Sequence, residues 1–141
     1  MTINLKNLEQ RKLIHPPKWL TDNCHYLVIM GSHAYGTETP ESDYDIYGWC
    51  IPPKNVLFPW LENKVFGFDP FNSFEQWQEQ HIVDDSSKKE MDFSVYNITR
   101  YFYLCAMCNP NMIDSLFVPQ NCLINCSPIA QIVRENMSLS L

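Results

Sequence analysis

Two aspartates one residue apart, Asp43 and Asp45, are the side chains of this sequence best suited to chemistry. On a β-strand, residues two positions apart project from the same face, with their Cβ atoms about 6.5–7 Å apart. Carboxylates held that close repel each other unless a cation lies between them or one of them is protonated. Mg²⁺ prefers oxygen ligands and is commonly held by one or two carboxylates together with substrate phosphates. The pair therefore indicates a binding site for Mg²⁺ or Mn²⁺.

A Gly-Ser pair, Gly31-Ser32, precedes the two aspartates with ten residues in between. Glycine lets a backbone approach a ligand closely because it has no Cβ. Ser32 is predicted to begin a helical turn over residues 32–36, where free N–H groups and a hydroxyl can bind phosphate oxygens. The segment could thus hold the triphosphate of a nucleotide at one end and its metal ions at the other. Two metal ions in such a site can activate an attacking oxygen and stabilise the departing one.

Three predicted strands would position these residues. The apolar run HYLVIMG indicates a short buried strand that ends at the glycine. The segment DYDIYGWCI alternates in the manner of a strand, and it places Asp43 and Asp45 on one face together with two aromatic residues. The segment KKEMDFSVYNI predicts another strand, which carries a third acidic residue, Asp92, between two apolar neighbours.

Helices are predicted around these strands from amphipathic spacing and from the positions of prolines. They are expected over residues 3–14, 54–61 and 95–108, after Asn109-Pro110, and from Ser127-Pro128 past Val133. The resulting order of helix, strands, a mixed region, a strand and further helices is typical of an α+β or α/β protein. One domain over residues 1–141 is expected, with a core at about 25–118 and a C-terminal helical extension at 119–141.

The composition limits the partners of the chain. Its 141 residues are 45% apolar, enough for a globular domain with a core. Sixteen acidic residues against ten basic ones give a formal charge of -6, which argues against sequence-independent attraction to the phosphates of long duplex DNA. No apolar run reaches the roughly 18 residues of a membrane span, and the polar start MTINLKNLEQRKL lacks the apolar segment of a secretory signal. We therefore expect a soluble, cytoplasmic protein that binds no membrane.

Taken together, these motifs resemble the signature of a known superfamily. The Gly-Ser pair, the Asp-x-Asp pair and Asp92 look like the nucleotide- and metal-binding pattern of the DNA polymerase beta-like nucleotidyltransferases. The longer string GSHAYGTETPESDYDIYG, with NPNMIDSLF downstream, is similar to an uncharacterised bacterial and phage group of predicted nucleotidyltransferases. The resemblance covers about residues 25–118. It implies an α+β fold, in a minimal or truncated version, in which a small mixed β-sheet has helices packed on one face.

The resemblance also implies roles for individual residues. Asp43 and Asp45 would bind the catalytic metal ions, and Asp92 would bind the second metal ion and help to deprotonate an acceptor hydroxyl. Gly31 and Ser32 would bind the triphosphate. The implied reaction moves a nucleoside monophosphate from an NTP, such as ATP, to a hydroxyl of a protein, a small molecule or an RNA end, and releases pyrophosphate. Self-association or a partner subunit is consistent with so short a chain.

Two other functions remain open beside this one. Short length and few basic residues are also consistent with a catalytically inactive regulatory module that binds a nucleotide or a partner. Four downstream cysteines could hold a structural zinc ion, but the first two lie in the apolar run YFYLCAMC, which favours free, buried thiols. These cysteines are Cys105, Cys108, Cys122 and Cys126. Further candidates for contacts to phosphate or base, with a purely structural role as the alternative for each, are His33, Tyr35, Lys88, Lys89 and Arg100.

Overall fold

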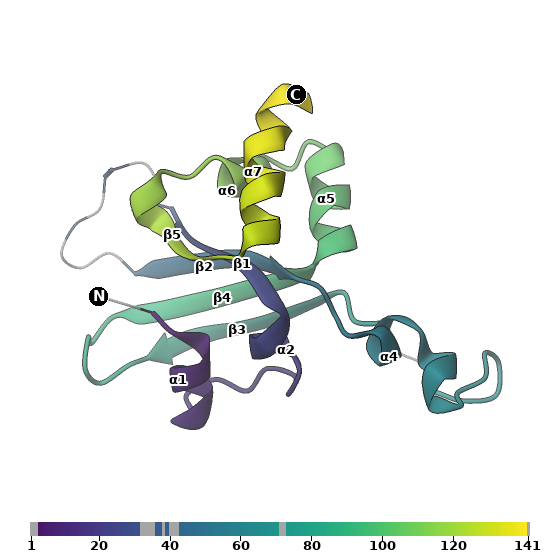
Figure 1. Cartoon of the computed structure of the whole chain (residues 1–141). Coiled ribbons are helices and arrows are strands. Elements are labelled where there is room, and N and C mark those ends of the chain that lie inside the picture. The colour runs from purple at the N-terminus through teal and green to yellow at the C-terminus, as the bar shows by residue number, and fades with distance from the viewer. Residues whose placement is uncertain (1–2, 32–35, 38, 40–42, 71–72, 141) are drawn as a thin grey trace.

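The computed structural model describes residues 3–31, 36–37, 39, 43–70 and 73–140. The strands within these residues are β1 (Cys24–Met30), β2 (Tyr44–Cys50), β3 (Gln76–Val83), β4 (Glu90–Asn97) and β5 (Leu123–Cys126). The α-helices are α1 (Leu5–Gln10), α2 (Leu20–Asn23), α4 (Lys54–Leu57), α5 (Ile98–Ala106), α6 (Pro110–Leu116) and α7 (Pro128–Ser140). Two short 3-10 helices are η1 (Pro59–Glu62) and η2 (Gln120–Cys122). Figure 1 shows the strands as one layer with helices above and below it.

The strands form one mixed sheet in the order β3-β4-β2-β1-β5. β2 and β4 run parallel to each other, and the other neighbouring pairs are antiparallel. Because two parallel strands need a crossover connection, the chain leaves the sheet after β2, passes through α4 and η1, and returns along β3 before it enters β4. The starts of β2 and β4 therefore lie at the same end of the sheet, next to the end of β1.

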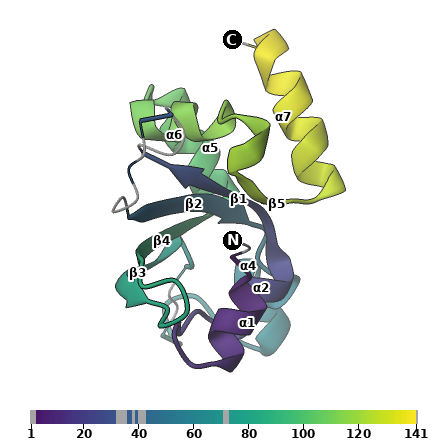
Figure 2. The same cartoon turned by 90° about the vertical axis from the view of Figure 1, so that its left-hand side faces the viewer.

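Each face of the sheet has its own hydrophobic core. The face under α5, α6 and α7 contributes to a core of Tyr26, Val28, Met30, Trp49, Tyr96, Tyr101, Met112, Leu116, Val118, Cys122 and Ala130. The core of the other face consists of Ile3, Leu5, Leu8, Ile14, Leu20, Cys24, Leu27, Ile46, Cys50, Trp77, Met91, Phe93 and Val95. Figure 2 shows α5, α6 and α7 above the sheet and α1 and α2 below it. The mixed sheet with a helical layer on one face confirms the predicted fold class, and the N-terminal segment adds α1 and α2 against the second face.

The alternation along β2 agrees with the prediction. Ile46 and Cys50 point into the core on the side of α1, whereas Trp49 is buried in the core on the side of α5, α6 and α7. Asp45 and Tyr47 flank Ile46 on the strand, so they face the opposite side of the sheet, which is the side of Trp49. This side is where α6 approaches the start of β2, as described below for the candidate site.

Most helices lie where the sequence predicts them. Pro110 begins α6, and Asn109 before it accepts hydrogen bonds from two backbone N–H groups of the first turn. α5 begins at Ile98 rather than near residue 95, because β4 continues to Asn97. In the part of the chain that the structure describes, no helix combines the length and the apolar composition needed to cross a membrane.

β3 and β5 are strands that the sequence analysis does not predict. Along β3 only Trp77 is buried, and the glutamines that alternate with it are exposed. An edge strand with one open face needs few apolar residues, so its sequence lacks the apolar alternation that marks a half-buried strand. β5 is four residues long and pairs only with β1 among the described strands, at the opposite edge of the sheet.

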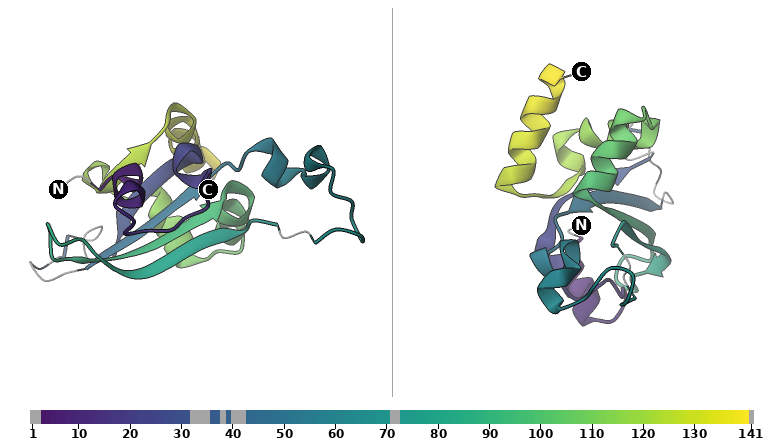
Figure 3. Two further views of the ribbon diagram at one scale, coloured as in Figure 1. Left: turned by 90° about the horizontal axis from the view of Figure 1, so that it is seen from below. Right: turned by 90° about the vertical axis from the view of Figure 1, so that its right-hand side faces the viewer.

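The connection between β2 and β3 projects beyond the sheet, as Figure 3 shows. It carries α4 and η1, and the rings of Phe58 and Trp60 on it have centroids 5.2 Å apart. Its exposed apolar side chains are Leu57, Phe58, Trp60, Leu61, Val65, Phe66 and Phe68. The projection begins at the end of β2 opposite to Asp45, so it takes no part in the site described next.

Candidate active site

Asp45 and Asp92 lie side by side on neighbouring strands. They are register partners in the parallel pair of β2 and β4. Both project from the face covered by α5, α6 and α7, because the residues next to them, Ile46 and Phe93, belong to the opposite core. Neighbouring strands are about 4.8 Å apart, a spacing at which two carboxylates can share a cation. Asp45 is exposed and Asp92 is partly buried.

The other two polar residues of the predicted set are described only in part. Asp43 is exposed and lies immediately before β2. Ser32 lies outside the described residues, as do His33, Tyr35 and most of the helical turn predicted over residues 32–36. The roles of these residues therefore stay predictions.

The turn after β1 brings the backbone against the carboxylate of Asp45. Gly31 in this turn has a φ of +72°, a left-handed conformation that residues with a Cβ rarely adopt. A Cβ at this position would lie 3.0 Å from Oδ2 of Asp45. Met30, the preceding residue, is the register partner of Asp45. The absence of a side chain at Gly31 is what allows the turn and the carboxylate to lie together.

A small cavity lies beside Asp45. It has a volume of about 150 Å³ and is lined by Met30, Gly31, Asp45, Tyr47 and Asn111. Asn111 belongs to α6, so this helix closes the cavity from above the sheet. Burial raises the pKa of Tyr47, and the neighbouring Tyr96 and Asp45 raise it further. The phenol of Tyr47 therefore stays protonated and can donate a hydrogen bond into the cavity.

The structure adds two residues that the sequence analysis does not single out, His81 on β3 and Glu90 on β4. The backbone N–H of His81 donates to Oδ1 of Asp92 at 2.8 Å. The ring Nδ1 of His81 contacts the carboxylate of Glu90, and this carboxylate raises the pKa of the imidazole. One ligand atom from each of His81, Glu90 and Asp92 lies within 4.8 Å of the others, and Asp43 and Asp45 are not part of this group. The spacing Glu90-x-Asp92 repeats that of Asp43-x-Asp45, and this signal could have identified Glu90. His81 carries no such signal, because β3 is not predicted.

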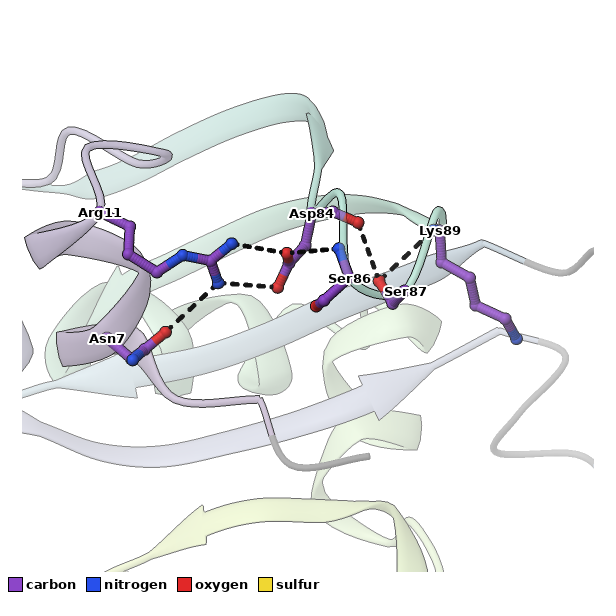
Figure 4. A network of polar contacts seen from close by, with 6 residues as sticks. All are labelled: Asn7, Arg11, Asp84, Ser86, Ser87 and Lys89. Carbon is purple, nitrogen blue, oxygen red and sulfur yellow. Dashed lines mark hydrogen bonds and ion pairs between the residues drawn. The ribbon is translucent and has the colours of Figure 1, made fainter.

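A polar network holds the turn between β3 and β4. Arg11, directly after α1, donates from Nη2 to Oδ1 of Asp84 at 2.8 Å and from Nη1 to Oδ2 at 3.0 Å, as Figure 4 shows. The hydrogen-bonded guanidinium lowers the pKa of Asp84, which also accepts the backbone N–H of Ser86 at 3.1 Å. The ammonium of Lys89 lies 4.8 Å from the centre of the Tyr44 ring. These contacts tie the turn to α1 and to β2, and so position the start of β4, where the third aspartate lies.

Arg100 lies away from the aspartates. Arg100 is on α5, which follows the end of β4 opposite to Asp92, and it lines a separate cavity there. The cysteines are free thiols, but the expected burial of Cys105 and Cys108 is wrong, because Cys105 is only partly buried and Cys108 is exposed just after the end of α5. Burial raises the pKa of two other cysteines, Cys24 and Cys50, to about 12. The ligating group found among the described residues contains none of the cysteines.

Comparisons with known proteins agree with the resemblance carried by the motifs. A family model, the RNA repair pathway DNA polymerase beta family (RlaP), matches residues 2–138. An uncharacterised 38.9 kDa protein from the nrdC-mobD intergenic region of Enterobacteria phage T4 is 27% identical over 97 residues, which cover 67% of this chain but only 25% of the phage protein. No solved structure matches the chain. Because the family model covers nearly all of it, the chain belongs to the RNA repair pathway DNA polymerase beta family, within the nucleotidyltransferase superfamily.

Proposed function

We propose that this protein is a metal-dependent nucleotidyltransferase that moves a nucleoside monophosphate from an NTP to an acceptor hydroxyl and releases pyrophosphate. The observation that carries this proposal is the register of Asp45 with Asp92 on adjacent parallel strands, beside the turn at Gly31. Membership of the family supports nucleotidyl transfer as the type of reaction.

The acidic residues fit a divalent cation. Asp45 and Asp92 bring two carboxylates to neighbouring strand positions, and a cation between two carboxylates is attracted by both. Asp43, immediately before β2, offers a further carboxylate. Carboxylate oxygens suit both Mg²⁺ and Mn²⁺, and we assign these three residues as the metal ligands. A bound ion of this kind supplies charge neutralisation for phosphates and lowers the pKa of a hydroxyl that it contacts.

The residues around Asp45 suit the phosphate end of a nucleotide. The cavity of about 150 Å³ is smaller than the roughly 300–1,000 Å³ of sites that enclose a whole small molecule. We assign Gly31 and Ser32 to the triphosphate, because glycine leaves room for a close approach to the backbone. Tyr47 and Asn111 have O–H and N–H groups that can donate to phosphate or sugar oxygens in the same cavity.

Asp92 is the residue that we assign to the proton of the acceptor. Its Oδ1 accepts the backbone N–H of His81, which orients the carboxylate. Oδ2 is then the atom that would take the proton from the acceptor hydroxyl. Among a protein, a small molecule and an RNA end, the RNA repair pathway named in the family description favours the RNA end. The net charge of -6 argues against long duplex DNA.

The experiment follows pyrophosphate release and label transfer from α-labelled NTPs to short RNA with Mg²⁺ or Mn²⁺. Asp45→Asn and Asp92→Asn each remove one charge at nearly constant volume, so each should lower the rate at least about a hundredfold. Asp22→Asn is the matched control, because Asp22 lies on α2, away from the site. Its Oδ1 is 2.6 Å from Nζ of Lys6 on α1. Transfer that persists in both Asp45→Asn and Asp92→Asn would rule out the mechanism. Calorimetric NTP binding without turnover under either metal would favour the inactive nucleotide-binding module instead.

A further inference from the structure

His81 and Glu90 face Asp92 at the end of the hairpin formed by β3 and β4. The pairing of these strands is irregular between Glu79 and Ile82, and His81 within this bulge has a φ of 59°. The bulge turns the backbone N–H of His81 toward Oδ1 of Asp92, 2.8 Å away, while the ring Nδ1 contacts the carboxylate of Glu90. One imidazole and two carboxylates thus converge, with ligand atoms within 4.8 Å of one another.

A second histidine–glutamate pair, formed by His15 between α1 and α2 and Glu79 on β3, provides an internal comparison. Nδ1 of His15 lies 3.0 Å from Oε1 of Glu79, and the backbone N–H of His15 donates to Oε2 at 2.8 Å. The side chains of His15 and His81 are similarly exposed, at 72% and 77%. Among the described residues, no third ligating side chain joins the His15 pair. Asp92 is therefore what distinguishes the His81 cluster from an ordinary ion pair.

The donors of the His81 cluster favour a transition-metal ion over Mg²⁺. Mg²⁺ is bound through oxygen ligands and keeps several of its waters. Imidazole nitrogen combined with carboxylate oxygen suits divalent transition metals better, because these ions accept nitrogen ligands. The exposed ring of His81 and the partly exposed Glu90 leave the remaining coordination positions open to water or to a phosphate.

We propose that His81, Glu90 and Asp92 form a binding site for a divalent transition-metal ion, and that this site shares Asp92 with the cation site assigned to Asp45. Each carboxylate oxygen has two lone pairs, so Oδ1 of Asp92 can accept the N–H of His81 and still bind the ion of this site. Both lone pairs of Oδ2 are then left for the cation shared with Asp45 and for the proton of the acceptor. The geometry of the hairpin alone carries the inference that the three residues bind a metal ion. A role of this ion in nucleotidyl transfer rests in addition on the proposed function. If the protein transfers nucleotides, the site should make transfer faster with Mn²⁺ than with Mg²⁺, and this difference should depend on His81.

Mn²⁺ binding to the full chain without nucleotide, followed through the EPR signal of free Mn²⁺, tests the site. His81→Gly removes the imidazole but keeps the N–H and tolerates the positive φ, so the titration should show one of the two bound Mn²⁺ ions, the one at the hairpin, weakened at least about tenfold. Glu90→Gln leaves the bulge unchanged and should weaken binding to a similar degree. His15→Gly is the matched control and should bind Mn²⁺ as the wild type does. Pulsed EPR should detect a nitrogen coupling to Mn²⁺ in the wild type and none in His81→Gly.

Equal Mn²⁺ binding by the wild type and His81→Gly, or displacement of Mn²⁺ by an equal concentration of Mg²⁺, would overturn the inference. Asp45→Asn separates it from the proposed function, because this variant should lose nucleotidyl transfer and keep the nitrogen coupling. A wild type that shows the nitrogen coupling but transfers no nucleotide would refute the proposed function and leave the metal site standing. The reverse result, transfer without any coupling, would refute the metal site alone.

Discussion

Replacement of Gly31 by alanine should damage the site more than it damages the fold. Gly31 has a φ of +72°, and an added Cβ would lie 3.0 Å from Oδ2 of Asp45. Gly36 has a φ of +68°, and an added Cβ there would meet no described atom within 4 Å. The two alanine variants therefore impose similar backbone strain, but only Gly31→Ala presses on a predicted metal ligand.

The expected magnitudes follow from these two contributions. The left-handed conformation costs a residue with a Cβ about 1–2 kcal/mol, so both variants should melt about 3–6 °C below the wild type. A contact of 3.0 Å is tighter than an ordinary van der Waals separation, so the carboxylate must move by a few tenths of an ångström. Because a displacement of about 1 Å can cost a hundredfold in rate, Gly31→Ala should have a kcat roughly tenfold below that of Gly36→Ala.

Thermal unfolding followed by circular dichroism measures the shared loss of stability, and pyrophosphate release measures the loss specific to the site. The melting temperatures of the two variants should agree within about 2 °C, while their rates differ roughly tenfold. Equal rates would show that nucleotidyl transfer does not depend on the position of Asp45 against the turn. A greater loss of rate in Gly36→Ala than in Gly31→Ala would contradict the assignment of the turn.

Three further predictions concern the fold around the site. In Gly48→Ala the added Cβ would overlap the carbonyl oxygen of Tyr26 on β1, so the free energy of unfolding should fall by at least about 3 kcal/mol. An unchanged midpoint of unfolding in urea would contradict this. Because burial raises the pKa of Cys24 to about 12, a thiol reagent should label the exposed Cys108 far faster than Cys24. Mass spectrometry of the labelled peptides measures the two rates, and equal rates would contradict this prediction. The pKa of Asp84 is lowered in the folded state, so its carboxylate stabilises the fold above the ordinary pKa of 3.8, and the contribution is lost as the pH falls below that value. The difference in melting temperature between the wild type and Asp84→Asn should therefore shrink on acidification, and a difference that grows would refute the assigned pair.

The strands that carry the aspartates could be predicted because their apolar residues indicate which positions are buried. The alternation of Asp45, Tyr47 and Trp49 with apolar neighbours predicts one shared face, and the structure confirms it. The two apolar neighbours of Asp92 predict β4 in the same way. The pairing of Asp92 with Asp45 could not be predicted in this way, because strand order and register depend on contacts between segments that are distant in the sequence.

Other parts of the site could not be predicted, for physical reasons. β3 leaves one face open, so it needs little apolar surface, and without β3 nothing connects His81 with Asp92. Asn111 reaches the cavity because α6 packs above the start of β2, a tertiary contact between segments far apart in the sequence. The assignments of Asp43 and Ser32 rest on the motif and remain predictions.

The central claim is that Asp45 and Asp92 bind the same divalent cation. A crystal structure of the protein with Mn²⁺ and a non-hydrolysable NTP analogue, with anomalous scattering used to locate the ion, measures this directly. We expect an anomalous peak in contact with carboxylate oxygens from both residues, and the triphosphate against the turn at Gly31. A peak that neither carboxylate contacts, or a nucleotide bound elsewhere on the chain, would contradict the claim.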